Sequence, residues 1–349
     1  MESFKVIAPT RVDLAGGTLD LWPLYCLTEG ASTINLAIGI FVEIKVQWQP
    51  AKDIQIFLEH PQSGKVKITS KMQMEDYSNM AAAVKFPAYI VGKYLASKQS
   101  FSKGLHATIS WQTQAPVGSG LGGSSTLAVA LARAMSHLFS DYTEQGWQWR
   151  LMAWVRDAEA AFLKVPTGTQ DYLASLFGGF NRFDSVFGEM RRTPYAAQTT
   201  QELAKRLVVI FSGEQHHSGK SNWEVYQSAI SADPKVVGGL RDIAGITSHM
   251  DSELRSAHLS WSNIGKLMKQ EWQVRRAVFR VQTPRLDEIL SFLDKQKVLG
   301  AKVCGAAAGG SLIALVAPEK RDELIQSCQT QGLKVLPSKP CLTGVEVHR

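Results

Sequence analysis

A glycine-rich stretch, APVGSGLGGSST at residues 115–126, constrains the fold of this chain more than any other segment. The alternation of apolar and polar residues at 105–111 predicts a strand before it, and the alanine-rich residues 127–135 predict a buried helix after it. The stretch therefore joins a strand to a helix N-terminus. Glycines let a backbone approach a ligand closely, and the first turn of a helix offers unpaired N–H groups and the positive end of its dipole. These properties suit an anion such as a nucleotide phosphate.

Two other interpretations of this stretch remain open from its residues alone. Gly118, Gly120 and Gly123 match a dinucleotide-binding fingerprint, which also requires an acidic residue about 20 positions further on. Asp141 is the acidic residue near that distance, but it lies in a turn-like Ser-Asp-Tyr-Thr and not at the end of a second strand. The remaining interpretation is a tight glycine turn followed by a Ser/Thr helix cap, with no ligand.

The composition excludes several classes of protein. The 349 residues are 45% hydrophobic and 20% charged, which is typical of a globular protein long enough for two domains. We expect no membrane span, and no signal peptide in the polar first residues, MESFKVIAPT. The net charge of +7 is dispersed, so we expect an attraction for anionic substrates and no nucleic-acid partner. The four cysteines lack a C-x-x-C spacing, which argues against a disulfide framework or a zinc site and favours a cytoplasmic location.

The first half of the chain predicts an antiparallel sheet with helices. Residues 4–14 predict a strand, and a turn follows at 15–18. Apolar and polar residues alternate through 31–70, which indicates an antiparallel sheet and counts against a dinucleotide-binding domain. Residues 81–98 predict a helix packed under the sheet, and residues 147–163 predict a second long helix.

A polar segment at 184–201 is predicted to be irregular and to separate two domains. The N-terminal domain would contain residues 1–185 and bind the nucleotide, and the C-terminal domain would contain residues 186–349. Residues 206–211 would open this second domain as a buried strand.

The second domain is predicted to be rich in helix. Residues 256–296 are strongly helical in pattern, with a new helix beginning at Pro284. Residues 302–316 predict two strands around a glycine turn, and residues 319–332 predict a final helix before a short strand at 334–336.

The glycine-rich stretch resembles the ATP-binding motif of the GHMP kinases, the family of galactokinase, homoserine kinase, mevalonate kinase and phosphomevalonate kinase. The stretch lacks the lysine of a Walker A sequence, so backbone N–H groups and the helix end would hold the phosphates. The residues implied to bind ATP are Pro116, Gly118, Ser119, Gly120, Leu121, Gly122, Gly123, Ser124 and Ser125.

Residues 8–20, APTRVDLAGGTLD, resemble the N-terminal motif of the same family in the form found in its sugar kinases. By this resemblance Arg11 lies beside the catalytic aspartate, and Asp20 accepts hydrogen bonds from substrate hydroxyls. Gly17 and Thr18 would also contact the substrate. Galactokinases have Glu-His at these two positions, so galactose itself is not implied. From the residues alone, the segment is a strand and a turn with a solvated arginine.

A third segment, at 167–181, resembles the family's G-x-x-D motif followed by F-G-G-F-N, as in bacterial heptose-phosphate kinases. The resemblance makes Asp171 the catalytic aspartate and Glu159, twelve positions earlier, a magnesium-binding glutamate. Mg²⁺ would be held by Ser124 and Glu159, with Ser125 as the alternative hydroxyl. From the residues alone, Glu159 lies on a solvated helix face and Asp171 is a helix N-terminal acid.

Residues 213–221 imitate a Walker A loop, but five residues separate the two glycines where that motif has four. We expect instead a loop that starts a helix, from which His216, His217 or Lys220 reaches the substrate.

Residues 302–316 resemble the third family motif, but its usual glycine-rich run is interrupted by Ala307 and Ala308, which tolerate positive φ poorly. The interruption weakens the assignment of a ligand site to this loop.

The resemblance covers residues 8–316 and implies an α+β fold of two domains with the active site in the cleft between them. It is closest to the heptose-phosphate, fucose and galactose kinases. The implied activity is the transfer of a phosphoryl group from ATP, with Mg²⁺, to a hydroxyl of a sugar or sugar phosphate. Asp171 would take the hydroxyl proton, and Arg11 would keep Asp171 ionised and offset charge on the transferring group. Two alternatives remain: a kinase of a non-sugar alcohol, and a non-catalytic sugar sensor. The residues do not indicate an oligomeric state.

Overall fold

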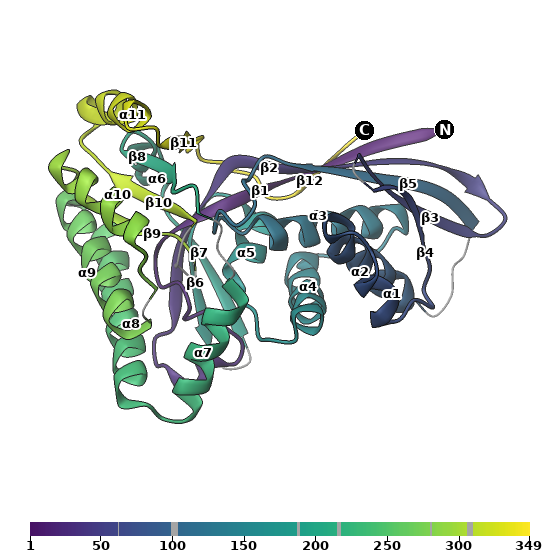
Figure 1. The fold of residues 1–349 in the computed structure, drawn as a ribbon, viewed down its shortest axis with the longest axis horizontal. Helices are drawn as coiled ribbons and strands as arrows, with labels where there is room; N and C mark the ends of the chain where they lie inside the picture. Colours follow the sequence, from purple (N-terminus) through teal and green to yellow (C-terminus); the bar gives the residue numbers. More distant parts are fainter. Residues whose placement is uncertain (62, 99–103, 187–188, 215–217, 280, 306–309) are drawn as a thin grey trace.

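The computed structural model describes residues 1–349 except 62, 99–103, 187–188, 215–217, 280 and 306–309. In this part of the chain the strands form two sheets, and helices pack against both (Figure 1). Most of the larger sheet and the helices beneath it occupy the centre and right of the view, and the smaller sheet lies at the upper left.

The larger sheet contains eight strands within the described residues. They are β1 (Glu2–Ala15), β2 (Ser32–Ala51), β3 (Ile54–His60), β4 (Gly64–Ile68), β5 (Gly104–Thr113), β6 (Phe180–Val186), β7 (Glu189–Pro194) and β12 (Glu346–His348). All neighbouring pairs are antiparallel except β3 with β5. The antiparallel sheet predicted over residues 31–70 is confirmed, because β2, β3 and β4 occupy that range.

Helices pack beneath this sheet (Figure 1). They are α1 (Met74–Ser78), α2 (Ala82–Ala96), α3 (Gly123–Leu138), α4 (Trp147–Leu163) and α5 (Gln170–Phe177). The core between sheet and helices is formed by side chains such as Ile44, Ile109 and Leu131, all fully buried. In β1, every residue from Ala8 to Ala15 is buried, because this half of the strand contacts α3 and α5 as well as helices of the second half of the chain.

The smaller sheet is antiparallel with the order β11-β8-β10-β9. Its strands are β8 (Leu207–Phe211), β9 (Gly300–Val303), β10 (Ser311–Leu315) and β11 (Lys334–Leu336), and its neighbouring helices are α6 (Ala197–Ala204), α7 (Ser218–Ile230), α8 (Pro234–Leu254), α9 (Trp261–Phe279), α10 (Pro284–Lys295) and α11 (Arg321–Thr330). A second core joins Val12 and Leu36 of the larger sheet to Val209, Ile313 and Met268. This core fixes β1 relative to α9.

The helices predicted in the second half are present, with two additions, α6 and α8. Residues 256–296 contain α9 and α10, and α10 begins at Pro284, where the Thr283 hydroxyl accepts a hydrogen bond from the N–H of Leu286. Neither α6 nor α8 was predicted from the sequence patterns. Within the described residues, no helix combines the length and the apolar character that a membrane crossing requires.

The prediction that residues 184–201 are irregular is wrong. The segment contains the end of β6, most of β7 and the start of α6. Most of β7 is exposed, and it pairs only with β6 among the described strands. A strand without a buried face lacks the apolar alternation that identifies strands in a sequence. The division of the chain at residue 185 stays a prediction.

The contact between α9 and β9 requires glycine on the helix. A Cβ on Gly265 would overlap the backbone carbonyl of Leu299. Gly245 in α8 has open space around its missing Cβ. In a helix interior, alanine is more favourable than glycine by about 1 kcal/mol at both positions. A difference in stability between the two alanine variants therefore measures the cost of the steric clash.

We therefore predict that Gly265→Ala lowers the free energy of unfolding by about 1–3 kcal/mol, as expected for overpacking. Gly245→Ala should leave it unchanged or raise it. Urea unfolding of both variants measures the difference. Equal stabilities would mean that α9 can move away from β9 without cost.

Candidate active site

The glycine-rich stretch lies between β5 and α3, as the sequence predicts. Gly122 precedes the first residue of α3 and has φ +78°. A Cβ on Gly122 would lie 2.8 Å from Cγ of Asp171, so a larger residue would displace that carboxylate. Glycine at this position allows the carboxylate of α5 to lie directly beside the start of α3.

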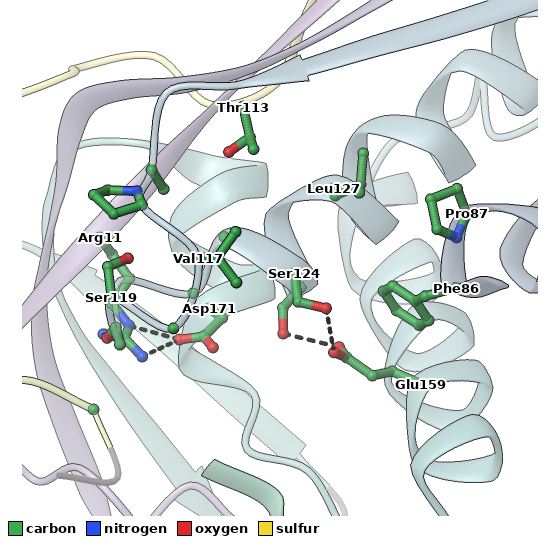
Figure 2. Close-up of a pocket in the computed structure, with 18 of the residues that line it drawn as sticks. Arg11, Phe86, Pro87, Thr113, Val117, Ser119, Ser124, Leu127, Glu159 and Asp171 are labelled. Carbon is green, nitrogen blue, oxygen red and sulfur yellow. Dashed lines mark hydrogen bonds and ion pairs between the residues drawn. The ribbon is translucent and has the colours of Figure 1, made fainter. Parts of the chain in front are cut away.

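A cavity of about 410 Å³ opens beside this stretch (Figure 2). One wall is the glycine-rich loop with the first turn of α3, and the other wall is apolar. The apolar wall includes Ala82, Ala83, Phe86 and Pro87 of α2, and Leu127. Sequence reasoning placed this helix under the sheet and missed its contribution to the cavity. The run of small residues at 81–83 is the signal that could have indicated it.

Arg11 and Asp171 point toward one another at the inner end of this cavity (Figure 2). Nε of Arg11 donates to Oδ1 of Asp171 at 2.6 Å, and Nη2 forms an ion pair with the same oxygen. Nη1 donates to the backbone oxygen of Gly120 at 2.8 Å. Burial alone would lower the pKa of Arg11, but the carboxylates of Asp171 and Asp13 outweigh it and raise the pKa above its usual value. Arg11 is therefore a buried, permanently charged group.

Glu159 of α4 is also buried and faces hydroxyl groups. Its carboxylate accepts hydrogen bonds from Ser125 at 2.8 Å and Ser124 at 3.4 Å (Figure 2). It also accepts one from Tyr172 at 2.6 Å. Burial raises the pKa of Glu159 to about 7, although these three hydrogen bonds act in the opposite direction. Glu159 therefore lies close to its ionisation midpoint at neutral pH. Sequence reasoning did not include Tyr172.

The oxygens around Glu159 fit a magnesium ion. Among the described residues, no three His, Cys, Asp or Glu side chains gather as a metal site. The oxygens next to the Glu159 carboxylate include the hydroxyls of Ser124 and Ser125, and Asp171 lines the same cavity. Mg²⁺ typically uses one or two carboxylates and takes its other ligands from water and phosphates. A divalent cation would also offset the cost of an ionised, buried Glu159.

A second, smaller cavity of about 70 Å³ adjoins the first, and Arg11, Glu159 and Asp171 line both. Asp20 lines only the smaller one, and its Oδ2 accepts from the backbone N–H of Gln170 at 2.9 Å. Burial raises the pKa of Asp20 to about 6, against the effect of that hydrogen bond.

The structure brings together most of the residues that the sequence singled out, and it leaves some outside the cavities. Thr18 lines the smaller cavity, whereas Gly17 does not; its backbone oxygen accepts from Arg275 instead. His216, His217, Ala307 and Ala308 lie outside the described residues, and the side chain of Lys220 is outside them too.

Two family models match the chain. Residues 88–179 match the GHMP kinases N terminal domain, and residues 254–332 match the GHMP kinases C terminal region. The chain belongs to the GHMP kinases. The family assignment made from the sequence motifs is confirmed, and this GHMP kinase accordingly has the predicted α+β fold of two domains.

Curated relatives extend over nearly the whole chain. This GHMP kinase is 24% identical over 347 residues to D-glycero-alpha-D-manno-heptose 7-phosphate kinase of Campylobacter jejuni, covering 95% of this chain and 94% of the relative. It is 23% identical over 335 residues to galactokinase of Thermosipho africanus, covering 89% and 88% of the two chains. It is 26% identical over 289 residues to mevalonate kinase of Thermococcus onnurineus, covering 78% of each.

Solved structures show the same fold. A D-glycero-D-manno-heptose 1-phosphate kinase from Bacteroides thetaiotaomicron superimposes with a TM-score of 0.74 at 18% identity, covering 99% of each chain. At this identity the likeness concerns the fold and leaves the substrate open.

The raised pKa of Glu159 predicts a pH dependence of stability. The ordinary glutamate pKa is 4.5, so the folded protein holds this proton more tightly than the unfolded chain does. Stability should therefore fall as pH rises from 4.5 to 7, by about 3 kcal/mol for this group. Glu159→Gln keeps a hydrogen-bond acceptor for Tyr172 and should lack this part of the fall.

Chemical unfolding at several pH values measures the contribution as the difference between wild type and Glu159→Gln. Glu319→Gln removes an exposed carboxylate and should follow the wild-type curve. Parallel curves for wild type and Glu159→Gln would show that burial does not hold the proton on Glu159.

Proposed function

We propose that this GHMP kinase transfers the γ-phosphoryl group of ATP to a hydroxyl of a sugar or sugar phosphate. One observation carries the proposal: the carboxylate of Asp171 borders both the large and the small cavity. A phosphoryl donor in the large cavity and an acceptor in the small one would meet at this carboxylate.

The large cavity suits ATP on both of its walls. Residues 116–120 and 122–125 line this cavity beside the N-terminal end of α3, where the phosphates are proposed to lie, and a helix N-terminus attracts anions. The apolar wall of Phe86 and Pro87 would contact the adenine. Bound Mg²⁺, held by Glu159 with Ser124 or Ser125, would neutralise phosphate charge as it does in other phosphoryl transfers. Ser125 lies closer to Glu159 than Ser124 does, so the alternative hydroxyl gains support.

In the reaction, Asp171 would accept the proton from the attacking hydroxyl. A general base must lie within hydrogen-bond reach of the proton that it takes, and Asp171 is the carboxylate at the boundary of the two cavities that carries an arginine ion pair. Arg11 would orient Asp171 through Nε and place positive charge beside the transferring group.

A sugar acceptor is supported by the small cavity and by the relatives. Asp20 keeps free acceptor capacity beside Asp171, and a carboxylate can accept from two hydroxyls. The relatives named for heptose phosphate and galactose align over most of the chain.

A screen that couples ADP release to a detectable signal tests the proposal, with free sugars, sugar phosphates, mevalonate and homoserine as acceptors. ADP release with a sugar or sugar phosphate supports it. ADP release with mevalonate or homoserine alone would assign a non-sugar alcohol, and ATP or sugar binding without ADP release would indicate a sensor.

We predict that Asp171→Asn reduces turnover by at least about 10²-fold, because general-base assistance contributes about 10² to 10⁴ in rate. The Kd for ATP, measured by calorimetry, should change little. Asp157→Asn, which alters an exposed aspartate of α4, is the matched control and should retain turnover. Retention of more than about a tenth of wild-type turnover in Asp171→Asn would contradict the role of base.

We predict that Asp20→Ala raises the apparent KM for the sugar at least about tenfold, since losing a charged hydrogen-bond partner costs about 1.5–3 kcal/mol. ATP affinity should be nearly unchanged. Asp20→Asn keeps an acceptor for the N–H of Gln170, so it separates the loss of charge from the loss of support for α5. Unchanged sugar kinetics in both variants would remove Asp20 from the acceptor site.

A further inference from the structure

Five charged side chains form a buried cluster behind the proposed active site. The buried charge cluster consists of Arg11, Asp13, Glu271, Arg275 and Lys302, and none of them is more than 4% exposed. Its members come from β1, α9 and β9, so the cluster joins elements of both sheets. Together with Asp171 it contains three cations and three carboxylates, which balances its charge.

Lys302 lies at the centre of the cluster, where its ammonium group pairs with two carboxylates. Nζ donates to Oδ2 of Asp13 at 2.6 Å and to the backbone oxygen of Asp13 at 3.3 Å, and it forms an ion pair with Glu271 at 2.8 Å. Burial alone would lower the pKa of Lys302, but Asp13 and Glu271 raise it. Lys302 is therefore charged although water does not reach it.

Asp13 connects Lys302 to the proposed catalytic pair. Its Oδ1 lies 3.6 Å from Nη1 of Arg11 and accepts from the backbone N–H of Gly305 at 2.7 Å. Burial alone would raise the pKa of Asp13, but Lys302, Arg11 and Arg275 lower it to about 2. Asp13 is therefore a second carboxylate near Arg11: it faces Nη1, whereas Asp171 pairs with Nε and Nη2.

Arg11 thus lies between two carboxylates that could each pair with it. It pairs closely with Asp171 and stays 3.6 Å from Asp13, whose nearer cation is Lys302. Without the ammonium group of Lys302, Asp13 would have Arg11 as its nearest cation, because no other cation of the described chain lies within 4.0 Å of it. The unbalanced, buried carboxylate would then attract Arg11 away from Asp171.

We propose that Lys302 is a positioning residue for phosphoryl transfer: by neutralising Asp13, it directs Arg11 to Asp171 and to the transferring phosphoryl group. This inference rests on the proposed function, since it assigns a role to Arg11 in that reaction. Lys302 itself does not line either cavity.

The remaining pair, Glu271 and Arg275, holds the adjoining backbone. Arg275 donates to the backbone oxygens of Gly17 and Gly305, both at 2.8 Å, and Glu271 accepts from the N–H of Gly16 at 3.2 Å. These contacts fix the loops on either side of the cluster without touching Arg11. Glu271 therefore pairs with Lys302, as Asp13 does, but does not compete for Arg11. A substitution of Glu271 is the matched control for a substitution of Asp13.

The test compares two double variants in the background of Lys302→Met. Lys302→Met alone leaves one carboxylate in excess, and it should lower kcat by about tenfold or more with the KM for ATP nearly unchanged. Lys302→Met with Asp13→Asn restores the charge balance and removes the competitor for Arg11. Lys302→Met with Glu271→Gln restores the same balance but leaves the competitor in place. Both amides keep an acceptor for the backbone N–H that each carboxylate binds.

We expect both double variants to recover thermal stability, and only the variant with Asp13→Asn to recover most of the lost kcat. A purely structural role for Lys302 predicts that kcat follows stability equally in both, and that result would overturn the inference. The comparison between the double variants holds even if Lys302→Met alone does not fold.

Wild type and Asp171→Asn in the same assay distinguish failure of this inference from failure of the proposed function. If the wild type releases no ADP with any acceptor, the proposed function fails. If the wild type is active and Asp171→Asn turns over freely, the pairing of Arg11 with Asp171 has no catalytic role, and the inference loses its basis. If Asp171→Asn is inactive while the two double variants have equal kcat, only the role of Lys302 is lost.

Discussion

The hydrogen-bond needs of one buried cation, Arg11, determine how the site is assembled. A guanidinium removed from water costs several kcal/mol unless its N–H groups find acceptors and its charge finds a partner. The acceptors are the carboxylate of Asp171 and the backbone oxygen of Gly120. They belong to α5 and to the glycine-rich loop, and Arg11 belongs to β1. The hydrogen bonds of this one side chain therefore align three segments. Arg11 is 160 positions from Asp171 and 109 positions from Gly120 in the sequence.

The buried carboxylates of the site fall into two kinds according to their neighbours. Asp13 contacts cations, and its pKa falls to about 2 although burial opposes this. Glu159 and Asp20 are equally buried, but hydrogen bonds from neutral groups are not enough to prevent burial from raising their pKa values to about 7 and about 6. The first kind is satisfied within the protein and supports structure. The second kind has no close ion pair among the described residues, and these two carboxylates line the cavities.

The parts of the site that depend on residues close together in the sequence are predicted well. The glycine-rich loop, the strand before it and the helix after it follow from residue types within about a dozen positions, and the structure has all three. The residues that the family motifs singled out also lie close together, because Arg11, Glu159 and Asp171 line both cavities. The polar strand β7 escaped prediction because it has no buried face.

The buried charge cluster escaped prediction for a different reason. Glu271, Arg275 and Lys302 are charged residues that a single sequence assigns to solvent-exposed faces, since charged side chains are rarely fully buried without partners. Their partners lie 255 to 289 positions away in β1 and the turn after it, and no local pattern reports such a distance. One local signal exists: Arg11 and Asp13 stand in residues 8–15 of β1, where every other residue is apolar or small.

The long separation between Asp13 and Lys302 has a consequence during biosynthesis. The two residues are 289 positions apart, and a ribosome adds about 5–20 residues per second, so β1 waits roughly 15–60 s for its ammonium partner. Throughout that time Arg11 and Asp13 are already synthesised, but α9 and β9, which bury them in the folded protein, are not. The larger sheet can begin to form, but the space around Arg11 and Asp13 stays hydrated until β9 has been synthesised. In a nascent chain, the helices and strands of the N-terminal half can therefore form before the candidate active site is ordered.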